Sequence, residues 1–156
     1  MNNATQHDNA FGEHEQNVLR TLAKLMIPPN DDVPGASDET IFAVALARLK
    51  SSAALVRRAV SALDAAARRE WGSDFLALDE GSQRATCELH LDGDFRKEFQ
   101  LQVVTSYYED DRVLVAIGLR AGPAFPKGYE MAETDWSLLD PVKKRQPFYR
   151  DVPVKN

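Results

Sequence analysis

The chain has 156 residues, a hydrophobic content of 44%, a charged content of 28% and a formal net charge of −5. These values are ordinary for one globular domain with a core of its own. The acidic balance argues against general nucleic-acid binding, which needs a basic surface, and the single cysteine, Cys87, excludes an internal disulfide and a thiolate metal cluster.

Charge is distributed unevenly along the chain. Residues 1–39 hold seven acidic against two basic side chains, whereas residues 137–156 hold five basic against two acidic ones. Residues 1–10 are polar and are predicted to form a disordered N-terminal arm. They contain no basic stretch followed by an apolar one, and no apolar run in the chain approaches the roughly 20 residues that span a bilayer. We therefore expect a cytoplasmic protein with no membrane insertion, or a periplasmic one if a partner carries the export signal.

The first helix is predicted over residues 11–27, and Pro28-Pro29 should end it because proline cannot donate to a helix. Its buried side would carry six apolar residues: Val18, Leu19, Leu22, Ala23, Leu25 and Met26. Residues 28–38 then combine turn formers with the carboxylates of Asp31, Asp32 and Asp38. Clustered carboxylates could hold calcium, but the glycine and glutamate positions of an EF-hand are absent. We prefer a rigid connector whose Asp and Ser side chains bond nearby backbone amides.

A long helical region follows, because no glycine or proline occurs from Asp38 to Trp71. Ser37 is expected to cap it, and acidic residues in the first turn suit the helix dipole. One long helix is possible in principle, but two helices that break near Ser51-Ser52 are preferred. Gly72 is a plausible C-terminal stop.

Another helix is predicted from a cap at Asp79 to about Leu91. Cys87 lies within it and is expected to be a small buried residue instead of a nucleophile. His90 could be a metal ligand beside Asp92 and Asp94, but a metal needs convergent ligands, and the other histidines, His7 and His14, are assigned to the N-terminal arm. A surface histidine is the preferred interpretation.

The stretch from Asp94 to Gly118 is the most strongly patterned part of the chain. Asp94 is expected to cap an amphipathic helix whose buried stripe carries Phe95, Phe99, Val103 and Tyr107, widened by Val104 and Tyr108. An acidic run at 109–111 ends this pattern. The β-branched residues Val113–Ile117 then predict a short β-like segment that ends at Gly118.

The C-terminal part of the chain, residues 119–156, is rich in prolines and widely spaced aromatic residues. The aromatic residues are Phe125, Tyr129, Trp136, Phe148 and Tyr149, and the prolines are Pro123, Pro126, Pro141, Pro147 and Pro153. Such a segment cannot build a core of its own, so it must lie either on its own helical body or on another protein, where aromatic residues are common hot spots. Both alternatives remain open at this point.

Four segments in a fixed order carry a resemblance to a known family. They are LMIPPNDDVPGASD, FLALDEGSQ, FRKEFQLQVVTSYYEDDRVLVAIG and PKGYE, within roughly residues 17–135. In this order they resemble the small subunit of gluconate 2-dehydrogenase, the subunit 3 family. The resemblance implies a helical accessory chain on a large FAD-dependent dehydrogenase of the glucose-methanol-choline (GMC) type, often with a multihaem cytochrome c as electron acceptor. It implies FAD in the large subunit and haem c in a third one.

The expected fold is therefore mainly α: a single-domain bundle of about five helices over residues 11–136, with the short β-like segment and an extended basic tail at 137–156. The resemblance transfers no catalytic, cofactor-binding or metal residue to this chain, and no nucleophile–base pair, phosphate loop or metal motif occurs in the sequence. The expected function is stabilisation or maturation of the flavin-bearing subunit of a sugar or polyol dehydrogenase. The alternative is a free-standing helical binding or scaffold protein. Candidate partner-interface residues are Tyr107, Tyr108, Phe125, Tyr129, Trp136, Phe148 and Tyr149.

Overall fold

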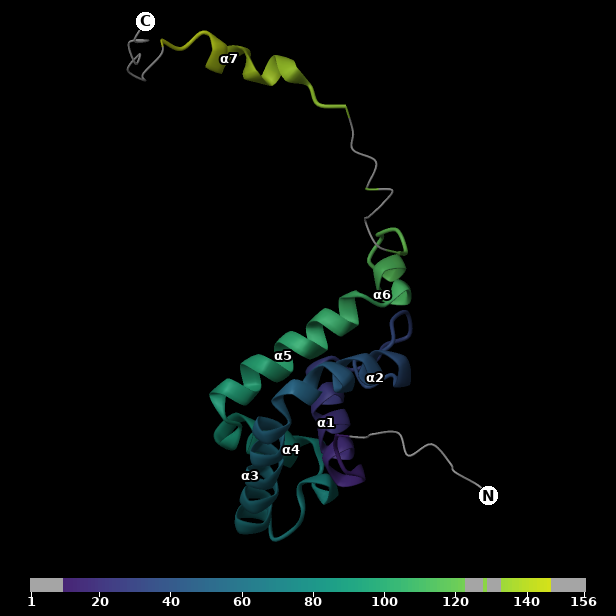
Figure 1. Ribbon diagram of the computed structural model, residues 1–156, viewed down its shortest axis with the longest axis vertical. Coiled ribbons are helices and arrows are strands. Elements are labelled where there is room, and N and C mark those ends of the chain that lie inside the picture. The colour runs from purple at the N-terminus through teal and green to yellow at the C-terminus, as the bar shows by residue number, and fades with distance from the viewer. Residues whose placement is uncertain (1–9, 123–127, 129–132, 147–156) are drawn as a thin grey trace, which may run out of the picture. The chain divides into compact units, whose positions relative to one another are not determined.

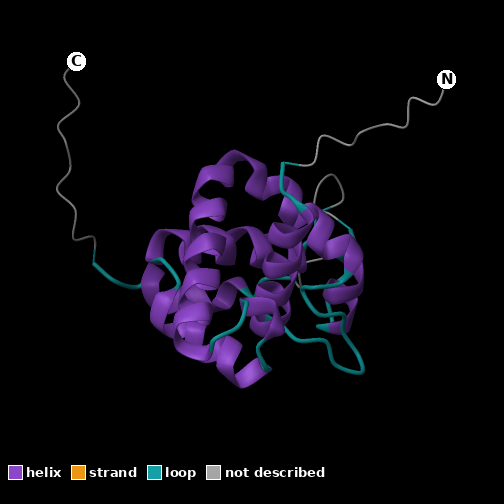
Figure 2. Ribbon diagram, turned by 90° about the horizontal axis from the view of Figure 1, so that it is seen from below, coloured by secondary structure: helices purple, strands orange, loops and turns teal. Residues whose placement is uncertain are grey.

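The computed structural model describes residues 10–122, 128 and 133–146. The chain divides into two compact units, Met1–Gly122 and Pro123–Asn156. The first unit contains helices and short 3₁₀ turns in this order: α1 (Glu13–Met26), α2 (Glu39–Arg48), η1 (Leu49–Ser52), α3 (Ala53–Trp71), η2 (Phe75–Ala77), α4 (Glu80–His90), α5 (Gly93–Tyr108) and α6 (Asp111–Ala116) (Figure 1). The described residues contain no strand (Figure 2), so the mainly-α prediction is confirmed.

The core of the first unit is built from the apolar faces that the sequence pattern indicates. Its largest fully buried side chains include Phe11, Phe42, Phe75 and Phe95. Helix α5 packs against α2 along the upper side of the unit in Figure 1, and α4 packs against α3. All four members of the predicted α5 stripe, Phe95, Phe99, Val103 and Tyr107, are buried.

Two of the predicted helix caps are displaced in the structure. Asp38 caps α2 by accepting the N–H of Thr40, where Ser37 was expected, and Asp92 caps α5 by accepting the N–H groups of Asp94 and Phe95, where Asp94 was expected. In each helix the cap lies three residues before the first deeply buried side chain, Ile41 or Phe95. Packing of that side chain therefore selects the cap from two nearby candidates. The predicted cap at Asp79 is confirmed, since its side chain accepts the N–H of Ser82.

The alanine-rich region from Asp38 to Trp71 forms two helices, as predicted, and not one long helix. The 3₁₀ turn η1 separates α2 from α3 at Leu49–Ser52, and Leu49 is fully buried there. Helix α3 ends at Gly72, which has φ of +70° and donates its N–H to the carbonyl of Arg68. Glycine reaches this left-handed conformation without the steric cost that other residues carry.

The prediction of a β-like segment at Val113–Ile117 is wrong, because these residues belong to α6 and to its C-terminal cap. Asp110 caps the helix by accepting the N–H of Arg112, and only Val113 turns into the core. The end is a Schellman motif, in which Gly118 and Leu119 donate to the carbonyls of Val115 and Leu114 at 3.0 and 2.9 Å. No neighbouring strand offers a ladder among the described residues, so the local capping bonds override β propensity.

The acidic connector between α1 and α2 is held by short-range hydrogen bonds. The side-chain oxygen of Asn30 accepts the N–H groups of Asp32 and Val33, and the N–H of buried Ala36 donates to the carbonyl of Ile27 at 2.9 Å. Within the part of the chain that the structure describes, no three His, Cys, Asp or Glu side chains lie close enough to hold a metal ion. The connector therefore has the bonding pattern of a structural turn.

The second unit contains two short helical turns, η3 (Trp136–Leu139) and α7 (Asp140–Lys143). Part of the segment that was expected to be extended, 137–156, is therefore helical, because Asp135 caps η3 through the N–H of Ser137 and Pro141 occupies the first turn of α7, where proline is tolerated. The boundary expected at residue 136 falls inside this unit, and the predicted disordered arm lies outside the described residues except for Ala10. Over the described ranges, no helix combines the length and the apolarity that crossing a bilayer requires.

Candidate partner-binding surface

The two adjacent tyrosines at the end of α5 differ in how deeply they are buried. Tyr107 is 8% exposed and belongs to the core, where burial raises the pKa of its hydroxyl. Tyr108 is 50% exposed and meets the ring of Tyr107 edge-on, with 5.2 Å between the ring centroids. Of this pair, only Tyr108 is accessible to a partner, whereas Tyr107 has a structural position.

The second unit exposes a group of apolar side chains around Trp136. Four other candidate residues, Phe125, Tyr129, Phe148 and Tyr149, lie outside the described residues. Trp136 itself is 67% exposed, and it is joined by Leu138, Leu139 and Val142, which are 74%, 43% and 55% exposed. We call Trp136, Leu138, Leu139 and Val142 the tail cluster. Sequence reasoning missed the last three, although the run WSLLDPV is more apolar than the residues that follow it.

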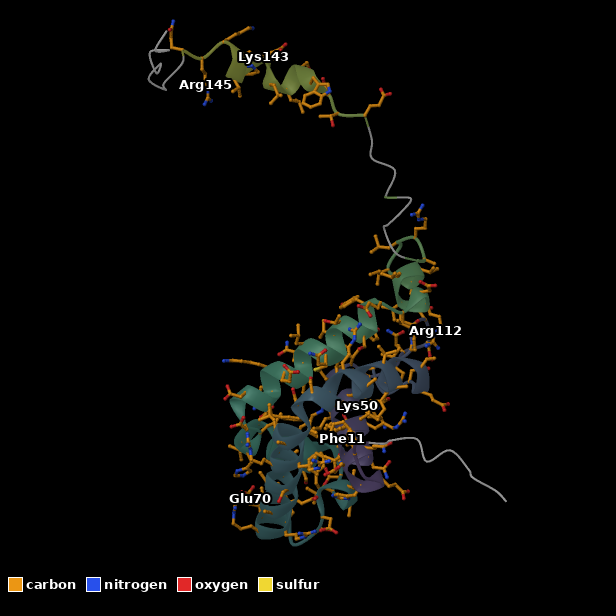
Figure 3. The ribbon with its side chains drawn as sticks, in the orientation of Figure 1. Phe11, Lys50, Glu70, Arg112, Lys143 and Arg145 are labelled. Carbon is orange, nitrogen blue, oxygen red and sulfur yellow. The ribbon has the colours of Figure 1, made fainter. Side chains whose placement is uncertain are left out.

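The tail cluster is followed directly by basic side chains. Lys143, Lys144 and Arg145 come next in the chain, and Figure 3 labels Lys143 and Arg145 on and just after the short helix of the second unit. Lys143 is paired with Asp140 at 3.3 Å. No described residue of the second unit from 133 to 146 is buried, so its apolar side chains do not form an internal core.

Arg112 connects α6 to the start of α2. Its guanidinium lies 2.7 Å from an Asp38 oxygen and 2.9 Å from an Asp110 oxygen, and it also donates to the hydroxyl of Thr40 at 3.0 Å (Figure 3). Asp38 and Asp110 are the caps of α2 and α6, so Arg112 joins the two capping carboxylates. We call Arg112, Asp38 and Asp110 the cap clamp. A second pair, between Arg48 and Glu109 at 2.6 Å, links α2 to the end of α5.

The cap clamp shifts the acid–base equilibria of its members. Hydrogen bonds from Arg112 and Thr40 hold the pKa of Asp38 well below its usual range, and hydrogen bonding to Arg112 lowers the pKa of Asp110. The same carboxylates raise the pKa of the Arg112 guanidinium. All three groups are therefore charged at neutral pH.

Replacing Arg112 by methionine is expected to destabilise the protein by about 1–2 kcal/mol at pH 7, the sum of two partly exposed ion pairs after solvent screening. The folded-state pKa values of Asp38 and Asp110 are depressed, so their contribution is complete above the unfolded pKa of about 4, decreases below it, and is lost only as the pH falls through the folded-state pKa values. In urea unfolding between pH 7 and pH 3, the stability difference between wild type and Arg112→Met should therefore become smaller below about pH 4.

Arg20→Met provides the control for this pH series, because Arg20 donates to the carbonyl of Ser37 and stacks over Phe42 at 4.5 Å, and it forms no ion pair with a carboxylate of the described residues. Its stability difference from wild type should stay constant over the same pH range. A constant difference for Arg112→Met as well would show that the cap clamp does not contribute through charge.

A surface hollow lies beside the cap clamp, between α2 and the turn from α5 to α6. Its volume is about 420 Å³. It is lined by Thr40, Ile41, Val44, Ser106, Glu109, Asp110, Asp111 and Arg112. Ser106 is only 3% exposed, and its Oγ has no hydrogen-bond partner within the described residues. We call this feature the Ser106 hollow. Sequence reasoning did not single out Ser106, because a serine among apolar helix positions carries no signal of its surroundings.

A second pocket, of about 330 Å³, lies where α1, α4 and α5 meet. Apolar side chains from Leu22 to Phe99 line it together with Cys87, and two arginines close its edges by donating to backbone carbonyls: Arg84 to Leu25, and Arg96 to Cys87. Burial raises the pKa of the Cys87 thiol to about 11. The thiol is therefore protonated at neutral pH, which agrees with a packing position and not with a nucleophile.

Comparison with protein families gives a match to the model described as gluconate 2-dehydrogenase subunit 3, over residues 13–131. The chain belongs to the gluconate 2-dehydrogenase subunit 3 family. Searches of curated proteins and of solved structures gave no significant match. The resemblance predicted from the four ordered segments is thus confirmed.

The region matched by the subunit 3 family contains the helical body and stops short of the tail cluster. It begins at the first residue of α1 and extends beyond α6, whereas Trp136 lies five residues after its end. The cap clamp and the Ser106 hollow therefore belong to the part shared with the subunit 3 family, and the tail cluster does not.

His14 and His90, the two histidines that the structure of this subunit 3 family member describes, have structural partners. His14 lies in α1 and not in a flexible arm, as the sequence analysis had assigned it, and its Nε2 is 2.6 Å from the buried carboxylate of Asp64. The helix reaches it because Glu15 bonds back to the N–H of Gly12 and starts α1 early. His90 lies 2.5 Å from Glu70 at the end of α3. Both pairs join neighbouring helices.

Proposed function

We propose that this chain is a non-catalytic accessory subunit that binds and stabilises the flavin-bearing large subunit of a GMC-type sugar or polyol dehydrogenase. Membership of the gluconate 2-dehydrogenase subunit 3 family supports a dehydrogenase partner. In this proposal FAD and the oxidation chemistry belong to the partner. The small subunit acts by binding the folded partner, which shifts the partner's unfolding equilibrium toward the folded state by mass action.

The observation that carries the proposal is the tail cluster. Its four apolar side chains are between 43% and 74% exposed. Exposed aromatic and aliphatic groups held close together are typical of protein interfaces, where tryptophan often contributes most of the binding energy. Burial of one leucine on a partner contributes about 1.5–3 kcal/mol. The cluster thus offers a contact that no described residue of its own unit satisfies.

The test is co-purification of tagged chain from its native host, with an absorbance spectrum of whatever accompanies it. A much larger polypeptide that carries a flavin band is expected. The substitution Leu138→Ser should then weaken the affinity of the chain for this flavin-bearing polypeptide by at least about 10-fold. Leu89→Ser is the matched control, because Leu89 on α4 is 73% exposed, almost as much as Leu138, but lies in the first unit.

Two results would each overturn a part of the proposal. Recovery of the chain alone, colourless and monomeric, would favour the free-standing binding protein. Equal affinity of Leu138→Ser and wild type for the flavoprotein would leave the subunit assignment intact and remove the tail cluster from the interface. Surface substitutions at both leucines should change folding stability by less than about 0.5 kcal/mol, so a change in affinity reports on binding.

A further inference from the structure

The Ser106 hollow combines three features that point to a bound group. The first is a buried hydroxyl without a partner: Ser106 Oγ is enclosed by the protein and accepts and donates no hydrogen bond within the described residues. Leaving a buried hydroxyl unsatisfied is costly, and native proteins usually match such groups with a protein atom or an ordered water, whose place a ligand atom can take. Ser106 lies on α5 and is one of the residues that line a hollow of about 420 Å³, which is open to the surface.

The second feature is the charge of the lining. Three carboxylates, from Glu109, Asp110 and Asp111, line the hollow against one guanidinium, that of Arg112. Arg112 pairs with Asp38 and Asp110, and Glu109 pairs with Arg48, so two of the three lining carboxylates already have a cationic partner. The lining as a whole carries an excess of negative charge, which favours a cation.

The third feature is an apolar wall opposite the acidic turn. Ile41 and Val44 of α2 line the hollow, and Val44 is 43% exposed. A long basic side chain has the matching construction, because its methylene stem covers apolar surface while its charged head reaches polar groups. A hydroxyl oxygen accepts a hydrogen bond from an ammonium or guanidinium group.

We propose that the Ser106 hollow receives a lysine or arginine side chain of the dehydrogenase large subunit. The stem lies on Val44, and the charged head donates to Ser106 Oγ and faces the carboxylates of the 109–111 turn. The inference rests on the proposed function, since it names a contact of the same complex. It adds a second docking point, on the body of the first unit, which the tail cluster does not provide.

The experiment measures affinity of full-length variants for the purified flavoprotein large subunit by calorimetry, at two salt concentrations. Ser106→Ala is expected to weaken binding about 5- to 10-fold while its thermal stability stays equal to or above that of wild type, because the change removes a polar group that is unsatisfied in the free chain. Val44→Arg places a cation in the hollow and should weaken binding at least 10-fold, with a reduced dependence on salt. Leu101→Arg, on the exposed side of α5, is the matched control and should bind as wild type does.

Each other outcome overturns a distinct statement. Wild-type affinity in both Ser106→Ala and Val44→Arg would overturn the hollow as a docking point and leave the accessory-subunit proposal standing. No binding by the wild-type chain would overturn both. A change in self-association of Val44→Arg, with unchanged affinity for the large subunit, would assign the hollow to a second copy of this chain and reject the present inference.

Discussion

Gly35→Ala is expected to lower the free energy of unfolding by about 3 kcal/mol, enough to reduce the melting temperature by roughly 10 °C. A β-carbon built on Gly35 would lie 2.6 Å from the backbone nitrogen of Pro29, 2.7 Å from its Cδ and 2.9 Å from the carbonyl oxygen of Ile27. Two of these three atoms are backbone atoms, so the connector must move as a whole to admit a methyl group. Thermal and urea unfolding followed by circular dichroism would measure the effect.

Gly93→Ala is the matched control for Gly35→Ala. Gly93 is the first residue of α5, and a β-carbon there meets no atom within 4 Å. Alanine at this position should be neutral or should stabilise the protein by a few tenths of a kcal/mol through helix propensity. Equal stabilities of Gly35→Ala and Gly93→Ala would show that the connector is not held against Pro29 as the structure has it.

Phe95→Ala is expected to destabilise the protein by about 4 kcal/mol, in the usual range for removing a buried phenyl ring. The ring of Phe95 is fully buried and stacks on Phe99 with 5.4 Å between the centroids, and the N–H of Phe95 donates to the Asp92 cap. The substitution thus leaves a cavity at the start of α5, the helix that packs against α2. Equilibrium urea unfolding at pH 7, analysed with a common slope, would give the difference.

Leu101→Ala tests whether the loss at Phe95 comes from burial. Leu101 lies on the same helix but is 59% exposed, so its truncation should change stability by less than about 0.5 kcal/mol. A loss of more than about 2 kcal/mol at Leu101, or of less than about 1 kcal/mol at Phe95, would be incompatible with the orientation of α5 described above.

The acidic connector, residues 28–38, has the carboxylates of a possible cation site, but its sequence motif is explained by packing and capping. The spacing I-P-x-x-D-x-x-P-G-A-x-D includes Gly35, whose missing β-carbon allows Pro29 and Ile27 to approach, and Ala36, which is buried and bonded to Ile27. Its last residue, Asp38, caps α2 and accepts Arg112. Gly35, Ala36 and Asp38, at the end of the motif, thus stabilise the junction of α1, α2 and α6.

Local rules were sufficient for most of the helical body. The 3.6-residue periodicity placed Phe95, Phe99, Val103 and Tyr107 on the buried side of α5. Proline after α1 and glycine after α3 located the ends of these two helices. The local rules failed at Val113–Ile117, where β-branched residues predicted a β-like segment. A run of this length contains no information on whether a neighbouring strand exists, and here caps on both sides hold it as a helix.

The amino-acid sequence by itself determined the class of fold, the faces of the helices and the family, because periodicity, caps and ordered motifs are properties of neighbouring residues. Only the tertiary structure decided which polar groups meet. Arg112 lies 74 residues from Asp38, and the surroundings of Ser106 come from both α2 and the turn after α5. Such contacts depend on how helices pack, and packing is decided by the shapes of many side chains at once, so spacing along the chain does not reveal them.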